Sequence, residues 1–291
     1  MGHAAKILAD SISPDGVRLL SFECEYPRII HAEMMTHRVF SRNAASSRAI
    51  PIKKMIEMVM EDPYVPSIWG QNQKGMQAET EVNAVVAYDA RYQWLSARDA
   101  AVRYAERLLQ LGIHKQLTNR LLEPFLWYKC IISGTEWGNF FHLRNNKDAH
   151  PDIQIIARMM QELYEKREPQ RLEYGQWHTP LISDEEQYTF CDSDPAALPV
   201  ADKLKVSVAR CARVSYLTHL GTRDLQADLD LHDRLLASGH LSPFEHVARP
   251  MTRHETTPSE ARPDECFSGN FRGWVQHRKE IPSESDILGV R

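Results

Sequence analysis

Residues 36–48 read Thr-His-Arg-Val-Phe-Ser-Arg-Asn-Ala-Ala-Ser-Ser-Arg and form the most distinctive stretch of this 291-residue sequence. The stretch holds one His, three Arg, one Asn and three Ser, and no carboxylate occurs between Glu33 and Glu57. Guanidinium groups bind phosphate through paired hydrogen bonds and serine hydroxyls add neutral donors, so this composition is typical of a phosphate or polyanion cradle. A solvated basic surface loop has the same composition, and the residues alone leave both interpretations open.

The charge and hydropathy of the whole chain exclude several classes of protein. The 35 basic and 39 acidic residues give a net charge of −4, which excludes a globally basic nucleic-acid binder but not a local basic site. No run of 18 apolar residues occurs and no apolar segment follows the N-terminal Met-Gly-His-Ala-Ala-Lys. We therefore expect neither a membrane helix nor a secretory signal, and a cytoplasmic location.

The cysteines and histidines do not predict a metal site or a disulfide framework. The five cysteines are scattered, odd in number and without a C-x-x-C pair, which favours reduced thiols. The 13 histidines include no H-E-x-x-H motif and no clustered Cys/His spacing. No metal is expected.

Hydrophobic periodicity predicts one half-buried strand over 17–26, with Leu20, Phe22, Cys24 and Tyr26 on its buried face. Helices are expected at 51–60, 77–111, 114–124, 151–166 and 225–238, and a short one is expected after Pro27. The Pro- and acid-rich residues 186–199 are expected to link a 1–185 segment to a 200–291 segment that packs into the same domain.

The opening stretch resembles the signature of the flavin-dependent thymidylate synthase family. His37-Arg38, followed by Ser46 and Arg48, is similar to that family's R-H-R-x7-S signature and to the Arg just beyond it. Two further segments extend the resemblance over well over half of the chain, so the basic stretch is interpreted as a ligand cradle.

The two further segments stand in an order that differs from that of the family. The segment similar to the family's C-terminal half comprises Arg120 to Pro124, Asn139, Leu143-Arg144 and 149–154 (Ala-His-Pro-Asp-Ile-Gln). The segment similar to its N-terminal half comprises 212–216 (Ala-Arg-Val-Ser-Tyr) and 242–246 (Ser-Pro-Phe-Glu-His). Because the latter precedes the signature in the family, we expect a circular permutation, which chains with neighbouring termini tolerate. The alternative is a degenerate tandem fusion with Gln276-His277-Arg278 as a second signature.

The resemblance implies an α+β fold in which a twisted sheet packs with long helices, in permuted order. It implies a homotetramer with active sites between subunits, and a flavin enzyme that methylates dUMP to dTMP. FAD is the implied cofactor, and NADPH and methylene-tetrahydrofolate are the implied co-substrates. Nucleic acid is not an expected partner.

The resemblance also implies which residues contact each ligand. Arg144 would face the uracil edge and stabilise negative charge as C5 becomes nucleophilic. The expected nucleotide contacts are Glu33, Ser46, Ser47, Arg48, Arg120 and Arg144. The expected flavin-side residues are His37, Arg38, Asn43, Asn139 and His246, the last near flavin or folate. Arg213 and Ser215 are expected to order the fold.

Five positions depart from the family pattern and widen the functional hypotheses. Thr36, Glu33, Ala44, Ser47 and Ser133 stand where Arg, Gln, an acidic residue, Gly and Asn are expected. A Glu accepts hydrogen bonds where a Gln amide also donates, so the base could be cytosine. Hydroxymethyl transfer is a second open outcome. A non-catalytic nucleotide- or nucleic-acid-binding relative is the alternative from another class.

Overall fold

The computed structural model describes residues 2–187, 189–194, 197–215, 224–256, 269–282 and 284. The strands are β1 (Ala4–Ile12), β2 (Arg18–Pro27), β3 (Ser41–Ala44), β4 (Trp127–Gly134), β5 (Gln170–Arg171), β6 (Ala248–Pro250) and β7 (Trp274–Gln276). The α-helices are α1 (His31–Met35), α2 (Ile52–Glu61), α3 (Ala84–Gln110), α4 (Lys115–Thr118), α5 (Gly138–Arg144), α6 (Pro151–Lys166), α7 (Asp184–Gln187), α8 (Val200–Ala212), α9 (Leu225–Ala237) and α10 (Arg253–Thr256). Short 3-10 helices are η1 (Arg28–Ile30), η2 (Asn119–Phe125), η3 (Arg213–Ser215), η4 (Ser242–Glu245) and η5 (His277–Glu280).

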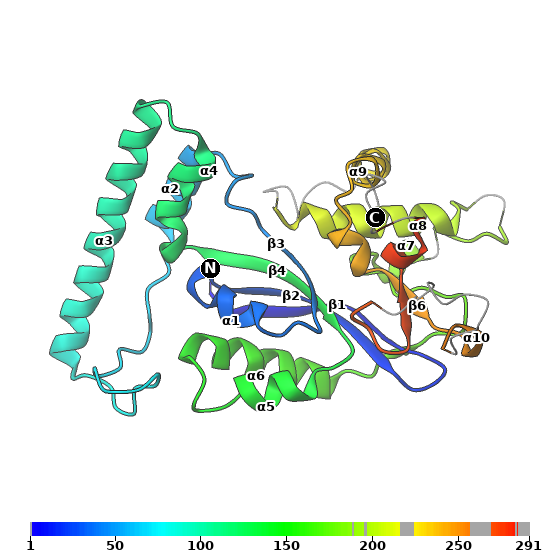
Figure 1. The fold of residues 1–291 in the computed structure, drawn as a ribbon, viewed down its shortest axis with the longest axis horizontal. Coiled ribbons are helices and arrows are strands. Elements are labelled where there is room, and N and C mark those ends of the chain that lie inside the picture. The colour runs from blue at the N-terminus through cyan, green and yellow to red at the C-terminus, as the bar shows by residue number, and fades with distance from the viewer. Residues whose placement is uncertain are drawn as a thin grey trace.

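A five-stranded sheet in the order β3-β4-β2-β1-β5 lies at the centre of the molecule. Only the β1–β5 pair is parallel among these neighbours. Helices α5 and α6 lie along the sheet, α2 and α3 stand at one end, and the C-terminal elements lie at the other (Figure 1). The expected α+β fold is confirmed.

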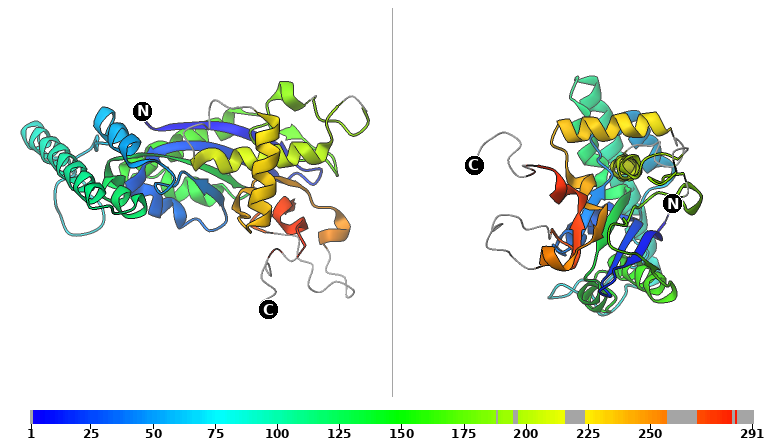
Figure 2. Two further views of the ribbon diagram at one scale, coloured as in Figure 1. Left: turned by 90° about the horizontal axis from the view of Figure 1, so that it is seen from above. Right: turned by 90° about the vertical axis from the view of Figure 1, so that its right-hand side faces the viewer.

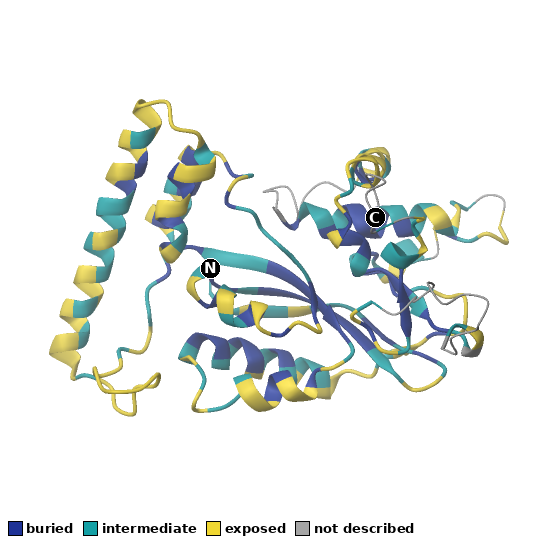
Figure 3. Cartoon of the chain, viewed as in Figure 1, coloured by how far each residue is buried: buried dark blue, intermediate teal, exposed yellow. Residues whose placement is uncertain are grey.

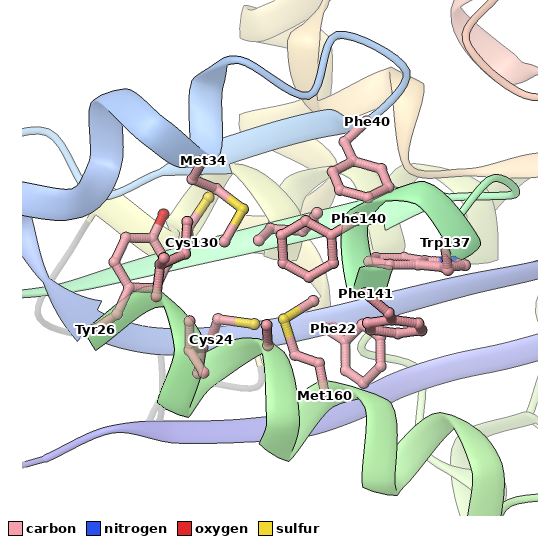
Figure 4. Close-up of a cluster of buried hydrophobic side chains, with 14 of the residues drawn as sticks. Phe22, Cys24, Tyr26, Met34, Phe40, Cys130, Trp137, Phe140, Phe141 and Met160 are labelled. Carbon is pink, nitrogen blue, oxygen red and sulfur yellow. The ribbon is translucent and has the colours of Figure 1, made fainter. Parts of the chain in front are cut away.

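One face of β2 packs against α5 and α6, as the sequence predicts. Leu20, Phe22, Cys24 and Tyr26 join a core with residues of both helices, and each is fully buried. Aromatic side chains from the loop before β3, from α5 and from the residue that precedes α5 complete this core, and Phe40, Trp137 and Phe140 gather there in Figure 4. The core holds α5, and with it Arg144, against the segment that begins β3.

The opposite face of β2 is also buried, so the prediction of a half-buried strand is wrong. Ser21 and Glu23 point to this face and are 0% and 8% exposed. The C-terminal part of the chain covers it: Leu19 packs with Phe271 and Trp274, and Cys211 and Val214 pack on Ile131 of β4. The hydrophobic periodicity of one strand does not reveal that residues about 200 positions later in the chain pack on its second face.

Helices α2 and α3 form a separate unit with η2 and their own apolar core. Its members include Met55, Val59, Ala105 and Leu122. Helix α3 starts at Ala84, later than predicted, because the Asn83 side chain accepts a hydrogen bond from the Val86 backbone N–H at 3.0 Å. Most of α3 is exposed (Figure 3).

A buried carboxylate fixes the C-terminal helices to one another. Asp228 on α9 is 0% exposed and accepts hydrogen bonds from Arg210 at 3.0 Å and Arg213 at 2.9 Å. Arg210 also binds both carboxylate oxygens of Glu186 at 2.9 Å. Arg213 therefore has the structural role expected for it. Phe190, within the expected 186–199 linker, is buried in a small core with Ile182 and Val206.

Within the described ranges, no helix is long and apolar enough to cross a membrane. No group of three His, Cys, Asp or Glu side chains suited to a metal ion occurs there either. Cys24, Cys130, Cys191 and Cys211 are free thiols, and Cys266 lies outside the described residues.

Candidate functional site

Arg144, the last residue of α5, is held by the first two residues of the opening stretch. Its Nε donates to His37 Nε2 at 2.9 Å, and one terminal nitrogen donates to Thr36 Oγ1 at 3.0 Å. The Glu33 carboxylate lies 4.0 Å from the other terminal nitrogen. Thr36 Oγ1 in turn donates to the Glu33 carbonyl at 2.7 Å. The guanidinium is thus oriented before any ligand arrives.

His37 can hold Arg144 only as a neutral imidazole. Burial, with help from the charges of Arg144 and Arg42, lowers the pKa of His37 to about 4. At neutral pH its Nε2 is then an acceptor and Nδ1 carries the proton. Phe40 and Phe140 contact the ring and keep it in place. The sequence assigned His37 to a flavin, and the contact with Arg144 adds a positioning role that it did not suggest.

The buried histidines predict a loss of stability in mild acid. Burial also lowers the pKa values of His178 and His246 to about 3. An unfolded chain therefore takes up protons below pH 6.5 that the folded chain refuses, so the free energy of unfolding falls as the pH drops from about 6.5. The expected slope is up to about 1.4 kcal/mol per pH unit for each histidine. Urea midpoints at pH 7.5 and 5.0 measure it.

The pH range of the loss of stability distinguishes the contribution of the histidines from that of the carboxylates. The pKa values of Glu186 and Glu255 are lowered to about 2, chiefly by their arginine partners against the opposing effect of burial, so their contribution is lost only below about pH 4.5. Equal urea midpoints at pH 7.5 and 5.0 would contradict the prediction.

A cavity of about 880 Å³ opens beside Arg144 and Glu33. It is walled by the loop before α3, by α1 and by the start of α6; its lining includes Ile29, Trp69, Trp94, Lys147 and Asp152. The loop is fastened by Gln77, whose Nε2 donates to the Asp148 carbonyl at 2.7 Å. The volume lies within the range of small-ligand sites, roughly 300–1,000 Å³.

A second polar group forms where the opening stretch ends, around Glu123 of η2. The Glu123 carboxylate accepts from Ser47 Oγ at 2.6 Å and from Arg120 at 2.7 Å, and Arg28 lies 3.8 Å away. Arg48 is exposed. The Glu123 carboxylate thus lies where the side chains of Ser47, Arg120 and Arg28 converge. The sequence did not predict a role for Glu123, because nothing in the order of the chain shows that Glu123 faces Ser47.

The remaining predicted residues divide between surface and interior. Arg38 and Asn139 are exposed, whereas His246 is 0% exposed. Asn43 is half-buried and donates to the Cys211 carbonyl at 3.5 Å, and Ser46 is half-buried. Arg42, in the middle of the basic stretch, donates to the carbonyls of Met34 and His37 at 3.0 Å each and so closes the turn before β3. That arginine is structural.

Residues 18–170, more than half of the chain, match the family described as thymidylate synthase complementing protein. The chain belongs to this family. This is the flavin-dependent thymidylate synthase family, so the chain is a flavin-dependent thymidylate synthase-like methyltransferase, as the opening stretch predicted. The matched range contains Arg144 and the Glu123 group. It leaves the 212–216 and 242–246 segments outside.

Two solved structures of the UMP/dUMP methylase PolB from Streptomyces cacaoi are similar to this chain. The complex with 5-Br UMP is 14% identical, with a TM-score of 0.46, and the match covers 56% of this chain and 89% of that chain. The complex with 5-Br dUMP is 18% identical, with a TM-score of 0.43, and the match covers 51% of this chain and 66% of that chain. No curated protein sequence matches the chain.

Proposed function

We propose that the enzyme converts dUMP to dTMP, with methylene-tetrahydrofolate and NADPH as co-substrates and FAD as cofactor. In the overall reaction C5 of the base loses a proton, and the methylene carbon bonds to C5 and breaks its bonds to both folate nitrogens. Each of these nitrogens takes up one proton, so the reaction consumes one proton from solvent besides the one that leaves C5. A hydride that originates in NADPH completes the methyl group. The products are dTMP, tetrahydrofolate and NADP⁺.

The observation that carries the proposal is the oriented guanidinium of Arg144 at the cavity that also contains Glu33. When C5 becomes nucleophilic, negative charge develops on the pyrimidine ring. A fixed cation stabilises such charge without reorganising in the transition state. Because neutral His37 and Thr36 use two of its five N–H donors, Arg144 retains others for the base.

The Glu123 group would receive the nucleotide phosphate. Arg120 is the expected contact to that phosphate, and we propose that Ser46, Ser47 and Arg48, which are expected to hold the nucleotide, contact the phosphate as well. Glu123 accepts the hydrogen bonds of Ser47 and Arg120 that a phosphate would need. Its carboxylate therefore competes with the phosphate and must release these donors when the nucleotide binds.

Replacing Glu123 with Gln is expected to lower KM for the nucleotide about 3- to 10-fold, because the variant removes a charge that repels the phosphate. Steady-state kinetics at two salt concentrations measure the effect, which shrinks as salt rises. The matched control is Glu57→Gln on α2. Its exposed carboxylate pairs only with Lys54 among the described residues, and KM stays unchanged. A higher KM for Glu123→Gln would show that Glu123 positions the donors.

The surface beside Arg144 fits a flavin cofactor. Arg38 and Asn139 are exposed, and neither side chain has a hydrogen-bond partner in the described part of the chain. Val39 and Leu143, the chain neighbours of Arg38 and Arg144, are 45% and 47% exposed and offer apolar contact to a ring. Arg38 would pair with the diphosphate. The cofactor, when bound, supplies the redox chemistry of the transfer.

The homotetramer is part of the proposal, and the outer surface of α3 supports it. Val85, Tyr88, Tyr92 and Tyr104 are each at least 63% exposed on this helix. Apolar surface of this kind marks protein–protein contacts. A second subunit at α3 would also bring further groups toward the cavity, because Trp94 of α3 lines it.

The circular permutation is supported by contacts between the 200–250 region and β3 and β4. Val214 packs on Ile131 of β4, and η4 contacts β3. Tyr216, the end of the 212–216 motif, lies outside the described residues. Chain segments far apart in sequence thus form one folded unit (Figure 2), as a permutation of one ancestral domain requires.

Glu33 favours a second candidate substrate, dCMP. Its carboxylate lies in the cavity beside Arg144 and only accepts hydrogen bonds, which suits the amino group of cytosine. For either base, the group transferred to C5 can be methyl or hydroxymethyl.

Mass spectrometry of products after incubation with FAD, NADPH, methylene-tetrahydrofolate and dUMP or dCMP tests the proposal. A gain of 14 Da on dUMP, the mass of one CH₂ group, supports dTMP synthesis, and a gain of 30 Da shows hydroxymethylation. If dCMP reacts, Glu33→Gln is expected to reduce its kcat/KM relative to dUMP about 10-fold or more. If neither nucleotide gains mass while both bind, the chain is a non-catalytic nucleotide-binding relative.

A further inference from the structure

Five buried polar side chains form an unbroken hydrogen-bonded line through the sheet. Ser11 Oγ lies 2.9 Å from His178 Nδ1, and His178 Nε2 lies 2.8 Å from Ser21 Oγ. Ser21 Oγ lies 2.5 Å from Ser133 Oγ, and Ser133 Oγ lies 2.8 Å from His246 Nδ1. All five residues are at most 3% exposed. They come from β1, β2, β4 and two loops, so only the tertiary fold brings them together.

The directions of these four hydrogen bonds are correlated. Both imidazoles are neutral at pH 7, so each has one N–H and one bare nitrogen, and each serine has a single hydroxyl proton. Ser21 and Ser133 each have two partners in the line, and each hydroxyl proton is paired within the line only when the serine donates to one partner and accepts from the other. A mismatch would place two protons or two lone pairs face to face in a dry interior, which is costly.

Two complete arrangements therefore exist. In the first, Ser11 donates to His178 Nδ1, every later donor points toward His246, and His246 carries its proton on Nε2. In the second, every bond is reversed, His246 carries its proton on Nδ1, and its Nε2 is a bare acceptor. In each arrangement His178 and His246 have the same tautomer.

The two ends of the line differ in their surroundings. His246 Nε2 is buried without a hydrogen-bond partner in the described part of the chain. η4, which precedes His246, contacts β3 of the signature stretch. Ser11, at the other end, lines a polar cavity of about 320 Å³ together with Lys203 and Thr179.

We propose that Ser11, His178, Ser21 and Ser133 form a positioning relay that couples the tautomer of His246 to that of His178. The tautomer of His246 decides whether its Nε2 donates or accepts a hydrogen bond at the ligand side. None of the relay residues is one that the family resemblance assigned a ligand, apart from His246 itself. The consequence for catalysis rests on the proposed function, in which His246 lies near flavin or folate; the coupling of the tautomers does not.

The test is the tautomer of each histidine in the full-length protein, read from long-range ¹H–¹⁵N spectra of histidine-labelled samples at pH 7.5. His178→Gln and His246→Gln variants assign the signals. The expected result is one and the same tautomer at His178 and His246. Opposite tautomers, or a charged ring at either position, would overturn the relay.

A variant in the middle of the line separates the relay from a merely structural role. Ser21→Ala removes the link, and kcat is expected to fall about 10-fold with the nucleotide KM unchanged; Ser21→Thr, which restores a hydroxyl, is expected to recover most of it. Equal kcat for wild type and a stably folded Ser21→Ala variant would overturn the catalytic consequence. Coupled tautomers in a protein inactive on every nucleotide would instead leave the relay standing and reject the proposed function.

Discussion

Replacing Arg144 with Ala is expected to reduce kcat at least about 10³-fold while flavin absorbance stays within about twofold of wild type. The loss follows from removing a cation that His37 and Thr36 hold in place at the cavity, where it would oppose the charge that develops on the base. Single-turnover formation of dTMP, with flavin content from the visible spectrum and nucleotide affinity from equilibrium binding, measures the three quantities separately.

Two further variants sharpen the assignment of Arg144. Arg144→Lys keeps the charge but loses the fork that reaches His37 and Thr36, so we expect an intermediate loss, about 10²-fold. Arg158→Ala removes an exposed arginine on α6 and leaves kcat unchanged. If Arg144→Ala lost its flavin and still bound the nucleotide, Arg144 would belong to the cofactor site.

Replacing Asp228 with Ala is expected to lower the free energy of unfolding by about 3–5 kcal/mol. Asp228 is fully buried and is the shared partner of Arg210 and Arg213. Without it Arg213 loses its carboxylate partner, and Arg210 keeps Glu186 and the Leu181 carbonyl as partners in the described part of the chain. Removing one member of a buried ion cluster leaves charge uncompensated, which costs more than the pair itself contributes. Urea denaturation followed by circular dichroism measures the change.

The neighbouring Asp230→Ala variant is the control for Asp228. Asp230 lies on the same helix, is exposed, and accepts only from Gln226 in the described part of the chain, so the change stays within about 0.5 kcal/mol. A loss below about 1 kcal/mol for Asp228→Ala would mean that water hydrates both arginines and that the cluster does not hold α9 and η3.

Helices with clear end signals could be predicted from the sequence. The 151–166 prediction coincides with α6, because Pro151 occupies the first turn and His150 accepts from the Asp152 backbone N–H at 3.2 Å. The 225–238 prediction ends one residue after α9, since Gly239 adopts a positive φ of 70° there. Such signals are local, so a sequence contains them in full.

Strands β1 and β4 were not predicted, although β4 pairs with both β2 and β3. Residues 126–143 are mostly apolar and aromatic, and a largely apolar run has the same appearance in a buried strand as in a buried helix. Pairing partners decide between them. For β4 these are Phe22, opposite Ile132, and Cys24, opposite Cys130, more than 100 residues away in the chain.

The sequence by itself determined the family, the basic stretch and the residues expected to hold the nucleotide, because these rest on residue identity and local spacing. Only the tertiary structure decided that Thr36 and His37 orient Arg144, that the Glu123 carboxylate accepts from Ser47 and Arg120, and that His178 connects to His246 through Ser21 and Ser133. Apart from the contact of Arg120, these contacts depend on the direction of side chains from elements more than 70 residues apart in the chain. Packing against the sheet sets those directions, and no local pattern records them.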